Sequence, residues 1–284
     1  MGRKQRLDSL LVERGLAPSR ERARALILAG AVEVEDRRDL KPGSAVGADA
    51  EIRVLRDPNP YVSRGGLKLA HALEAFGLRA EGLVCLDAGA STGGFTHCLL
   101  EAGAARVIAL DVGRGQLDWR LRTDPRVVVL EGKNVRDLVP EDLPEAPDLA
   151  AVDVSFISLR LALPPVAAVL KPPGWILALV KPQFEVGKGR VEKGGLVRDP
   201  AKHLEVLSGL IGFCRDRGLR VAGLTASPIT GAKGNIEYFL CLGLPPAGGE
   251  GAFPGAEEVR RVVEEAVGRL SRGRAGRSKP RARA

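Results

Sequence analysis

The sequence predicts an α/β fold: a mostly parallel sheet of seven strands with helices on both faces, preceded by a small α+β domain. Two observations support this prediction. From about residue 61 to residue 244, short runs rich in Val, Leu and Ala alternate with stretches of helical periodicity, an order typical of parallel sheets. The chain has 284 residues, which is enough for one large domain and one small one.

The front of the chain predicts two helices and two strands. Apolar residues recur at helical spacing over residues 6–15 and again over 20–29, where Ser19 is the expected N-cap. Residues 31–35 and 50–54 alternate between apolar and polar side chains, as half-buried strands do. We therefore expect a compact module ahead of the large sheet.

The large domain carries the repeated strand signal. Each predicted strand is a short apolar run followed by a turn or a helical stretch. In chain order these strands are 83–87, 106–111, 127–130, 149–153, 175–181, 219–227 and 237–242.

Composition shifts mark the expected boundaries. The link after the front module contains two prolines, and a Gly/Pro-rich stretch follows the last strand. The C-terminal end has an amphipathic helix over 256–270 and then a run with basic but no acidic residues, which predicts disorder. The predicted divisions are 1–55 for the front module, 56–62 for the linker, 63–245 for the sheet domain and 246–284 for the helix and tail.

The formal net charge of +8 favours a polyanionic partner such as RNA. A basic protein without such a partner is the plainer alternative. Basic residues gather at the front and on one face of the second helix, although a solvated face would look similar. The candidate contacts there are Arg3, Lys4, Arg6, Arg14, Arg20 and Arg22.

Four cysteines, at positions 85, 98, 214 and 241, lie in apolar stretches and form no Cys-x-x-Cys pair. This pattern predicts buried free thiols in a reducing compartment and no zinc site. The first residues lack an apolar segment typical of a signal peptide, and the longest apolar run is too short to span a bilayer. We expect a cytoplasmic protein with neither membrane nor metal.

A glycine-rich turn follows the first strand of the large domain. The run reads Asp87-Ala-Gly-Ala-Ser-Thr-Gly-Gly-Phe95, and such a turn lets the backbone approach a ligand closely. It lacks the Gly-x-Gly-x-x-Gly spacing that a pyrophosphate needs. Asp111 ends the next strand, where a carboxylate can accept hydrogen bonds from ribose hydroxyls.

These features resemble the cofactor site of class I (Rossmann-like) methyltransferases, which implies S-adenosylmethionine as the cofactor. By the same resemblance, Asn134 and Val135 lie against the adenine and Phe156 lies near the methionine end. The cofactor-binding candidates are Asp87, Gly89, Ser91, Thr92, Gly93, Gly94, Phe95, Asp111, Val112, Asn134, Val135, Asp153 and Phe156.

Two motifs that are missing from the sequence restrict which kind of atom can accept the methyl group. An Asn/Asp-Pro-Pro-Tyr run, typical of amine methylation, is missing after the fourth strand, and no cysteine lies between Cys98 and Cys214 to attack a pyrimidine ring. An oxygen acceptor such as a ribose 2′-hydroxyl is left. A lysine in a partly desolvated site near other cations can act as its base. Lys181 ends one strand, and Asp153 ends the neighbouring one.

Lys68, Asp153, Lys181 and Glu237 resemble the Lys-Asp-Lys-Glu tetrad of FtsJ-like ribose 2′-O-methyltransferases, which implies that these four are catalytic. The plainer explanation of each residue alone is an ordinary salt-bridged side chain at a strand or helix end, which is the more common role of a single lysine.

The front module resembles the RNA-binding module of the ribosomal-protein S-four type. The runs that carry this resemblance are Arg6-Leu7-Asp8, Ser19-Arg20-Glu-Arg-Ala23 and Gly30-Ala-Val32-Glu-Val34.

Over about residues 5–243 the whole chain resembles TlyA-type proteins. Further runs that carry this resemblance are Tyr61-Val-Ser-Arg-Gly-Gly-Leu-Lys68, Asp153-Val-Ser-Phe156, Val180-Lys-Pro-Gln-Phe-Glu185 and Gly231-Ala-Lys-Gly-Asn-Ile-Glu237. The resemblance implies 2′-O-methylation of a cytidine in ribosomal RNA within ribosomal subunits; some members of the family are named haemolysins.

Basic residues flanking the tetrad are expected to contact the RNA backbone around an extruded nucleotide: Arg64, Lys188, Arg190, Lys193 and Lys233. The Gly-rich stretch 186–195 is either a loop that orders on RNA or a mobile surface loop.

Three alternatives stay open: a non-enzymatic ribosome-binding factor, a membrane-lytic protein, and a methyltransferase for another RNA. The subunit, the cytidine and the oligomeric state are not fixed by the sequence.

Overall fold

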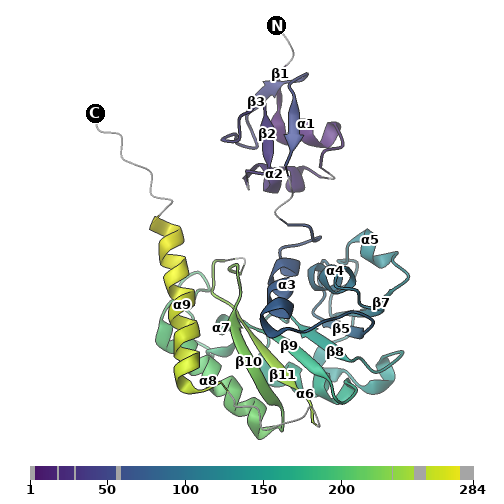
Figure 1. Ribbon diagram of the computed structural model, residues 1–284, viewed down its shortest axis with the longest axis vertical. Coiled ribbons are helices and arrows are strands. Elements are labelled where there is room, and N and C mark those ends of the chain that lie inside the picture. Colours follow the sequence, from purple (N-terminus) through teal and green to yellow (C-terminus); the bar gives the residue numbers. More distant parts are fainter. Residues whose placement is uncertain are drawn as a thin grey trace. The chain divides into compact units, whose positions relative to one another are not determined.

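The structure is a computed structural model that describes residues 4–17, 19–28, 30–55, 59–231, 233–245 and 254–275, with side chains as far as residue 269 (Figure 1). The chain divides into two compact units, residues 1–60 and 61–284. Arg3 and residues 276–284 of the predicted tail lie outside the described part.

The front unit has six short elements. Its helices are α1 (Leu7–Glu13) and α2 (Arg20–Leu28), and its strands form two antiparallel pairs, β1 with β3 and β2 with β4. The strand bounds are Lys4–Arg6 for β1, Val32–Val34 for β2, Ala45–Gly47 for β3 and Ile52–Val54 for β4. The first helix therefore begins one residue later than predicted, since Arg6 belongs to β1. Strands β1 and β3 were missed because Lys4–Arg6 is wholly polar and Ala45–Gly47 has one large apolar side chain, so neither shows alternation.

A buried carboxylate fixes the start of α1. Asp8 is fully buried, and it accepts hydrogen bonds from Arg6 Nη2 at 2.7 Å and from Arg20 Nη2 at 3.4 Å. The hydrogen bond from Arg6 lowers the pKa of Asp8 to about 2. The Ser19 hydroxyl accepts the backbone N–H of Arg22 at 3.2 Å, which confirms the predicted N-cap.

The second unit is built on one seven-stranded sheet, in the order β10-β11-β9-β8-β5-β6-β7. Strands β5 to β9 run parallel, and β11 pairs antiparallel with both β9 and β10. All seven predicted strands are confirmed, with small shifts at their ends. The bounds are Val84–Ala88 (β5), Arg106–Asp111 (β6), Val127–Glu131 (β7), Leu149–Val152 (β8), Trp175–Val180 (β9), Arg220–Ala226 (β10) and Tyr238–Gly243 (β11).

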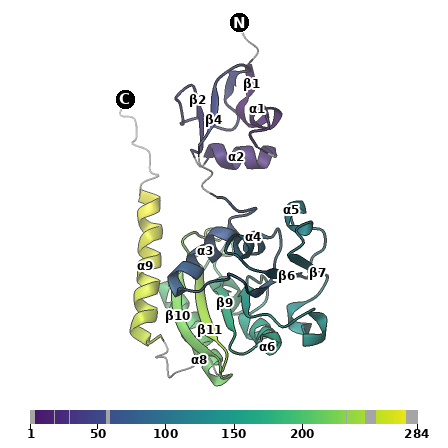
Figure 2. The ribbon, with the colours of Figure 1, turned by 45° about the vertical axis from the view of Figure 1, so that its right-hand side comes forward.

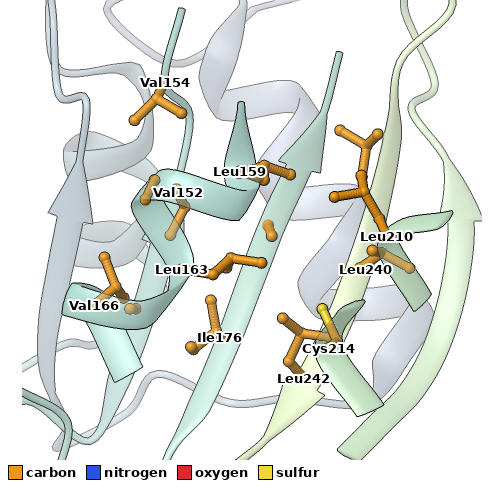
Figure 3. Packing of buried hydrophobic residues seen from close by; sticks show 14 of the residues in the cluster. Val152, Val154, Leu159, Leu163, Val166, Ile176, Leu210, Cys214, Leu240 and Leu242 are labelled. Atoms are coloured by element: carbon orange, nitrogen blue, oxygen red, sulfur yellow. The ribbon is translucent and has the colours of Figure 1, made fainter. Parts of the chain in front are cut away.

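Helices cover both faces of this sheet, as predicted. One face packs against α3 (Gly65–Phe76) and α4 (Gly94–Glu101), and the other against α6 (Leu159–Val169), α8 (Pro200–Asp216) and α9 (Ala256–Ala275). Figure 3 shows part of the core between the sheet and α6, α8 and α9, where Leu159, Leu163 and Val166 of α6 lie over the sheet. Short elements fill the loops: α5 (Trp119–Arg122), α7 (Pro182–Glu185), η1 (Val135–Asp137) and η2 (Pro140–Asp142).

Helix α9 packs against α8 and β10 (Figure 2). It buries Val259, Val262, Val263 and Ala266, and it runs to Ala275, so the predicted end at Leu270 was wrong. Arg and Ala are strong helix formers, and Arg272, Arg274 and Ala275 favour continuation of the helix beyond residue 270.

The four cysteines are buried free thiols, as predicted. In the described part of the chain, no helix is long and apolar enough to cross a membrane.

We predict that Asp8 makes the front unit sensitive to acid. The folded carboxyl, with a pKa of about 2, binds a proton less readily than the unfolded one, near 4. Its contribution to stability is therefore present above about pH 4 and is lost as the pH falls through about 2. Hydrogen exchange of the α1 and α2 amides should show Asp8→Asn less protected than wild type at pH 7, with the gap narrowing at about pH 2.5.

The matched control is Asp39→Asn, because Asp39 is 81% exposed and lies 3.6 Å from Arg37. We expect it to behave as wild type. An Asp8→Asn defect of the same size at both pH values would contradict the prediction.

Candidate active site

The site lies where the order of the parallel strands reverses. From β5, the chain adds β6 and β7 on one side and β8 and β9 on the other. The loops after such neighbouring strands diverge and leave a crevice at their carboxyl ends, where α/β proteins bind ligands. Val152, the last residue of β8, pairs with Ala88, the last residue of β5, and with Ala178 of β9, so β5 and β8 end level and β9 runs two residues further, to Val180.

The loop after β5 needs glycine at defined places. Gly89 has φ +97°, and a Cβ there would lie 2.5 Å from the carbonyl oxygen of Asp153. At Gly94 a Cβ would lie 2.1 Å from the Ser63 hydroxyl oxygen. The backbone of this loop therefore packs directly onto the end of β8 and onto the start of α3.

Asp111 ties this loop to the next one. Its carboxylate accepts the backbone N–H groups of Ser91 and Gly113, each at 2.7 Å. Each carboxylate oxygen has a second acceptor site, so Asp111 still has the capacity to accept ribose hydroxyls.

Asp87 lies beneath the loop rather than on the surface of a cavity. It is fully buried, and Thr96 Oγ1 donates to its Oδ2 at 2.6 Å. Its Oδ1 has no hydrogen-bond partner among the described residues. Burial raises the pKa of Asp87 to about 7. Its predicted contact with a cofactor stays a prediction.

Two adjoining cavities of about 380 and 370 Å³ open beside the loop and share Gly89, Ser91 and Asp153. Among the cofactor-binding candidates, Gly93 and Asp87 do not line them. The candidates that do are Gly89, Ser91, Thr92, Gly94, Phe95, Asp111, Val112, Asn134, Val135, Asp153 and Phe156. Ser63, Gln116 and Lys133 also line these cavities and were missed, because no motif marked them.

The second cavity suits a nucleoside. Its apolar surface includes Val112, which is 69% exposed, and Phe156, which is 88% exposed. Large exposed apolar side chains beside a carboxylate and an amide fit a planar base joined to a hydroxyl-bearing sugar. The residues present therefore fit the adenosyl part of S-adenosylmethionine.

The predicted tetrad is brought together as two ion pairs. Lys181 Nζ lies 2.5 Å from Asp153 Oδ1, and Lys68 Nζ donates to Glu237 Oε2 at 2.5 Å. The side chains of Lys68 and Lys181 are each 11% exposed. Burial raises the pKa of Glu237, and Lys68 offsets only part of this effect.

A third cavity of about 450 Å³ opens beside the tetrad. It shares Lys68 with the first cavity, and Ser155 and Phe156 with the second. The other residues that line it are Lys181, Gln183, Phe184, Val191, Gly195, Lys233, Asn235 and Glu237. The three cavities therefore meet at the tetrad.

Phe156 stands at this junction with a left-handed backbone (φ +65°), a conformation that costs a non-glycine residue free energy. Its ring centroid lies 5.1 Å from that of Phe184. A strained, exposed aromatic residue between two cavities is typical of a binding site rather than of a folding core.

The predicted RNA contacts near the tetrad differ in their surroundings. Arg64 lines the first cavity and donates to the carbonyl of Thr230 at 3.1 Å, while Lys233 lines the third. Arg190 forms two hydrogen bonds with Glu205, at 2.5 and 2.6 Å. Lys188 and Lys193 are exposed.

In the front unit, several residues predicted to contact RNA form hydrogen bonds within the unit itself. Arg14 donates to the carbonyls of Ala48 and Ala50, and Arg22 donates to the carbonyl of Asn59 at 2.5 Å. Lys4 is exposed. Because Arg guanidinium groups have several donors, these bonds leave a role in RNA binding open.

A seven-stranded sheet with this strand order and a cavity at its switch point whose lining suits a nucleoside define a class I methyltransferase. A family model described as FtsJ-like methyltransferase matches residues 61–244, and one described as S4 domain matches residues 5–52. The chain belongs to the FtsJ-like methyltransferase family and, with its S4 domain, to the TlyA-type group within it.

Relatives and solved structures agree with this placement. The 16S/23S rRNA (cytidine-2'-O)-methyltransferase TlyA of Mycobacterium tuberculosis is 49% identical over 85% of this chain and 91% of its own. Hemolysin A of Brachyspira hyodysenteriae is 42% identical over 82% of this chain and 97% of its own. A solved structure from Streptococcus thermophilus, described as a hemolysin, has a TM-score of 0.75 and 40% identity, covering 96% and 98% of the two chains.

We predict that the Lys68–Glu237 pair supports the fold only while both partners are present. Glu237→Gln leaves the Lys68 ammonium nearly buried without a counter-charge, which should lower the free energy of unfolding by about 3 kcal/mol. Lys68→Met combined with Glu237→Gln should cost clearly less than the sum of the single changes. Urea denaturation of wild type, Lys68→Met, Glu237→Gln and the double variant measures the coupling free energy between the two side chains.

The control is Glu205→Gln, which breaks the exposed pair with Arg190 and should cost less than about 1 kcal/mol. Additive losses at Lys68 and Glu237 would contradict the coupling.

Proposed function

We propose that this protein transfers the methyl group of S-adenosylmethionine to a ribose 2′-hydroxyl of ribosomal RNA. The observation that carries this proposal is the meeting of two lysine–carboxylate pairs with three cavities. Two of these cavities suit the cofactor, and the third suits an acceptor nucleotide. The names of the TlyA relatives, which specify cytidine-2'-O-methylation of 16S and 23S rRNA, support both the ribose and the cytidine.

Residues of the first two cavities would hold the cofactor. Asp111 would accept the ribose hydroxyls, Val112, Asn134 and Val135 would lie against the adenine, and Phe156 would lie near the methionine end. The backbone of the loop at Gly89 would lie against the remainder. When bound, S-adenosylmethionine supplies an electrophilic methyl group, and its carbon–sulfur bond pair stays on sulfur as the ribose oxygen bonds to carbon.

Lys181 acts as the base. In its neutral form, the amine takes the proton of the 2′-hydroxyl and becomes an ammonium ion. Asp153, at 2.5 Å from Nζ, stabilises the positive charge as it forms. The buried Lys68–Glu237 pair, which also lines the third cavity, holds a second, balanced pair of charges near the acceptor oxygen.

The third cavity would receive the acceptor nucleotide. Its rings, Phe156 and Phe184, offer apolar faces, and Lys233 at its edge offers a charge for phosphate. A nucleotide that enters this cavity from an RNA helix has to leave its stack. The S4 domain at residues 5–52 would supply additional affinity for RNA.

The test is incubation of the protein with radiolabelled S-adenosylmethionine and separately purified, unmodified small and large ribosomal subunits, followed by mapping of the labelled nucleotide. We expect label as 2′-O-methylcytidine. Lys181→Ala should lower the single-turnover rate by about 100-fold or more, with affinity for the cofactor retained.

The control variant is Lys171→Ala, since Lys171 is 65% exposed and pairs with Asp148 away from the tetrad; it should react as wild type. Label on a base atom, or a normal rate for Lys181→Ala, would refute the proposal. Tight subunit binding without transfer would favour a ribosome-binding factor.

A further inference from the structure

Lys181 has a second partner that the sequence did not single out. Its Nζ donates a hydrogen bond to the Ser155 hydroxyl at 2.8 Å, in addition to its ion pair with Asp153. Ser155 lies in the turn between β8 and α6, and it lines both the second cavity and the third. Its hydroxyl therefore stands where the cofactor side and the acceptor side of the site meet.

Two acceptors matter because of the geometry of a neutral amine. Such an amine has two N–H groups and one lone pair, arranged tetrahedrally with the bond to Cε. If Asp153 alone accepts a hydrogen, the amine can still rotate about the Cε–Nζ bond among several orientations. If Asp153 and Ser155 each accept one hydrogen, the lone pair has a single direction left, which is the condition for taking a proton from a fixed hydroxyl.

The turn that carries Ser155 is itself tied to the segment that carries Lys181. Glu185, four residues after Lys181, accepts the Ser158 hydroxyl at 2.6 Å and the backbone N–H of Leu159 at 2.7 Å. These bonds bridge the start of α6 to α7. These hydrogen bonds therefore restrict movement of the turn that carries Ser155 relative to Lys181.

The other lysine of the tetrad is held differently. Within the described residues, Lys68 Nζ donates a hydrogen bond to Glu237. The Lys68–Glu237 pair is more buried than the Lys181–Asp153 pair. The combination of a carboxylate and a hydroxyl on one amine thus distinguishes Lys181 as the group prepared for proton transfer.

We propose that Ser155 is a positioning residue that orients the Lys181 amine toward the acceptor hydroxyl. This inference rests on the proposed ribose methylation. Ser155 gains no charge and forms no covalent bond. The proton passes from the 2′-oxygen to Lys181 nitrogen, and the ribose oxygen bonds to the methyl carbon as described above.

The test compares two replacements of Ser155 by side chains that have the same shape as each other. Ser155→Thr keeps the hydroxyl, and Ser155→Val has a methyl group in its place. We expect Ser155→Val to lower kcat on ribosomal subunits about 10- to 100-fold, with KM and cofactor affinity within about twofold of wild type. Ser155→Thr should keep at least about a third of the wild-type kcat, because it still accepts the Lys181 hydrogen.

The control removes a helix N-cap elsewhere in the same domain. Asp199→Ala removes the N-cap of α8 and should lower Tm by a few degrees while leaving kcat within about twofold. It separates loss of Lys181 orientation from a general loss of stability.

The outcomes separate the two proposals. Equal kcat values for Ser155→Thr and Ser155→Val, or a loss that falls on cofactor affinity, would overturn the role of Ser155 while wild type still forms 2′-O-methylcytidine. A base-methylated product from wild type would refute the ribose reaction and the Ser155 inference together, since no ribose hydroxyl would then face Lys181.

Discussion

The ion pair between Lys181 and Asp153 is the contact on which the rest of the site depends. It joins the residues that directly follow β8 and β9, two adjacent parallel strands of which β9 runs two residues further. The carbonyl of Asp153 is also the surface on which Gly89 packs. Asp153 therefore contacts the glycine-rich loop through its backbone carbonyl and pairs with Lys181 through its side chain.

The two lysine–carboxylate pairs differ in burial in a way that matches different tasks. In the Lys68–Glu237 pair the side chains are 11% and 3% exposed, whereas in the Lys181–Asp153 pair they are 11% and 21% exposed. Desolvated pairs add little net stability, so two of them at one junction are better explained by chemistry than by folding. The more open pair is the one that can meet a substrate.

The sequence predicted the parts of the molecule that depend on local pattern. Strands β5 to β11 were predicted because each contains a short apolar run. Asp153 and Lys181 were singled out because each directly follows a strand, and Glu237 because it completes a tetrad that resembles the FtsJ-like one. The glycine-rich loop was recognisable because Gly89 and Gly94 are required by close backbone contacts, which leave a mark on the sequence.

What the sequence could not predict depends on residues that are far apart in the chain. Ser155 looks like any turn serine until β9 brings Lys181 to it. The third cavity forms only where Lys68, Phe156 and Asn235 converge. Arg14 looked like a free cation, but folding places it against the carbonyls of Ala48 and Ala50, a partnership that no local pattern reveals.

The most direct test of ribose methylation at this junction is the crystal structure of the protein with S-adenosylhomocysteine and an RNA that contains the target nucleotide. The distance to measure joins the ribose 2′-oxygen and Lys181 Nζ. We predict a hydrogen bond of about 3 Å, with the nucleobase in the third cavity. A ribose turned away from Lys181, with a base atom facing the cofactor instead, would contradict it.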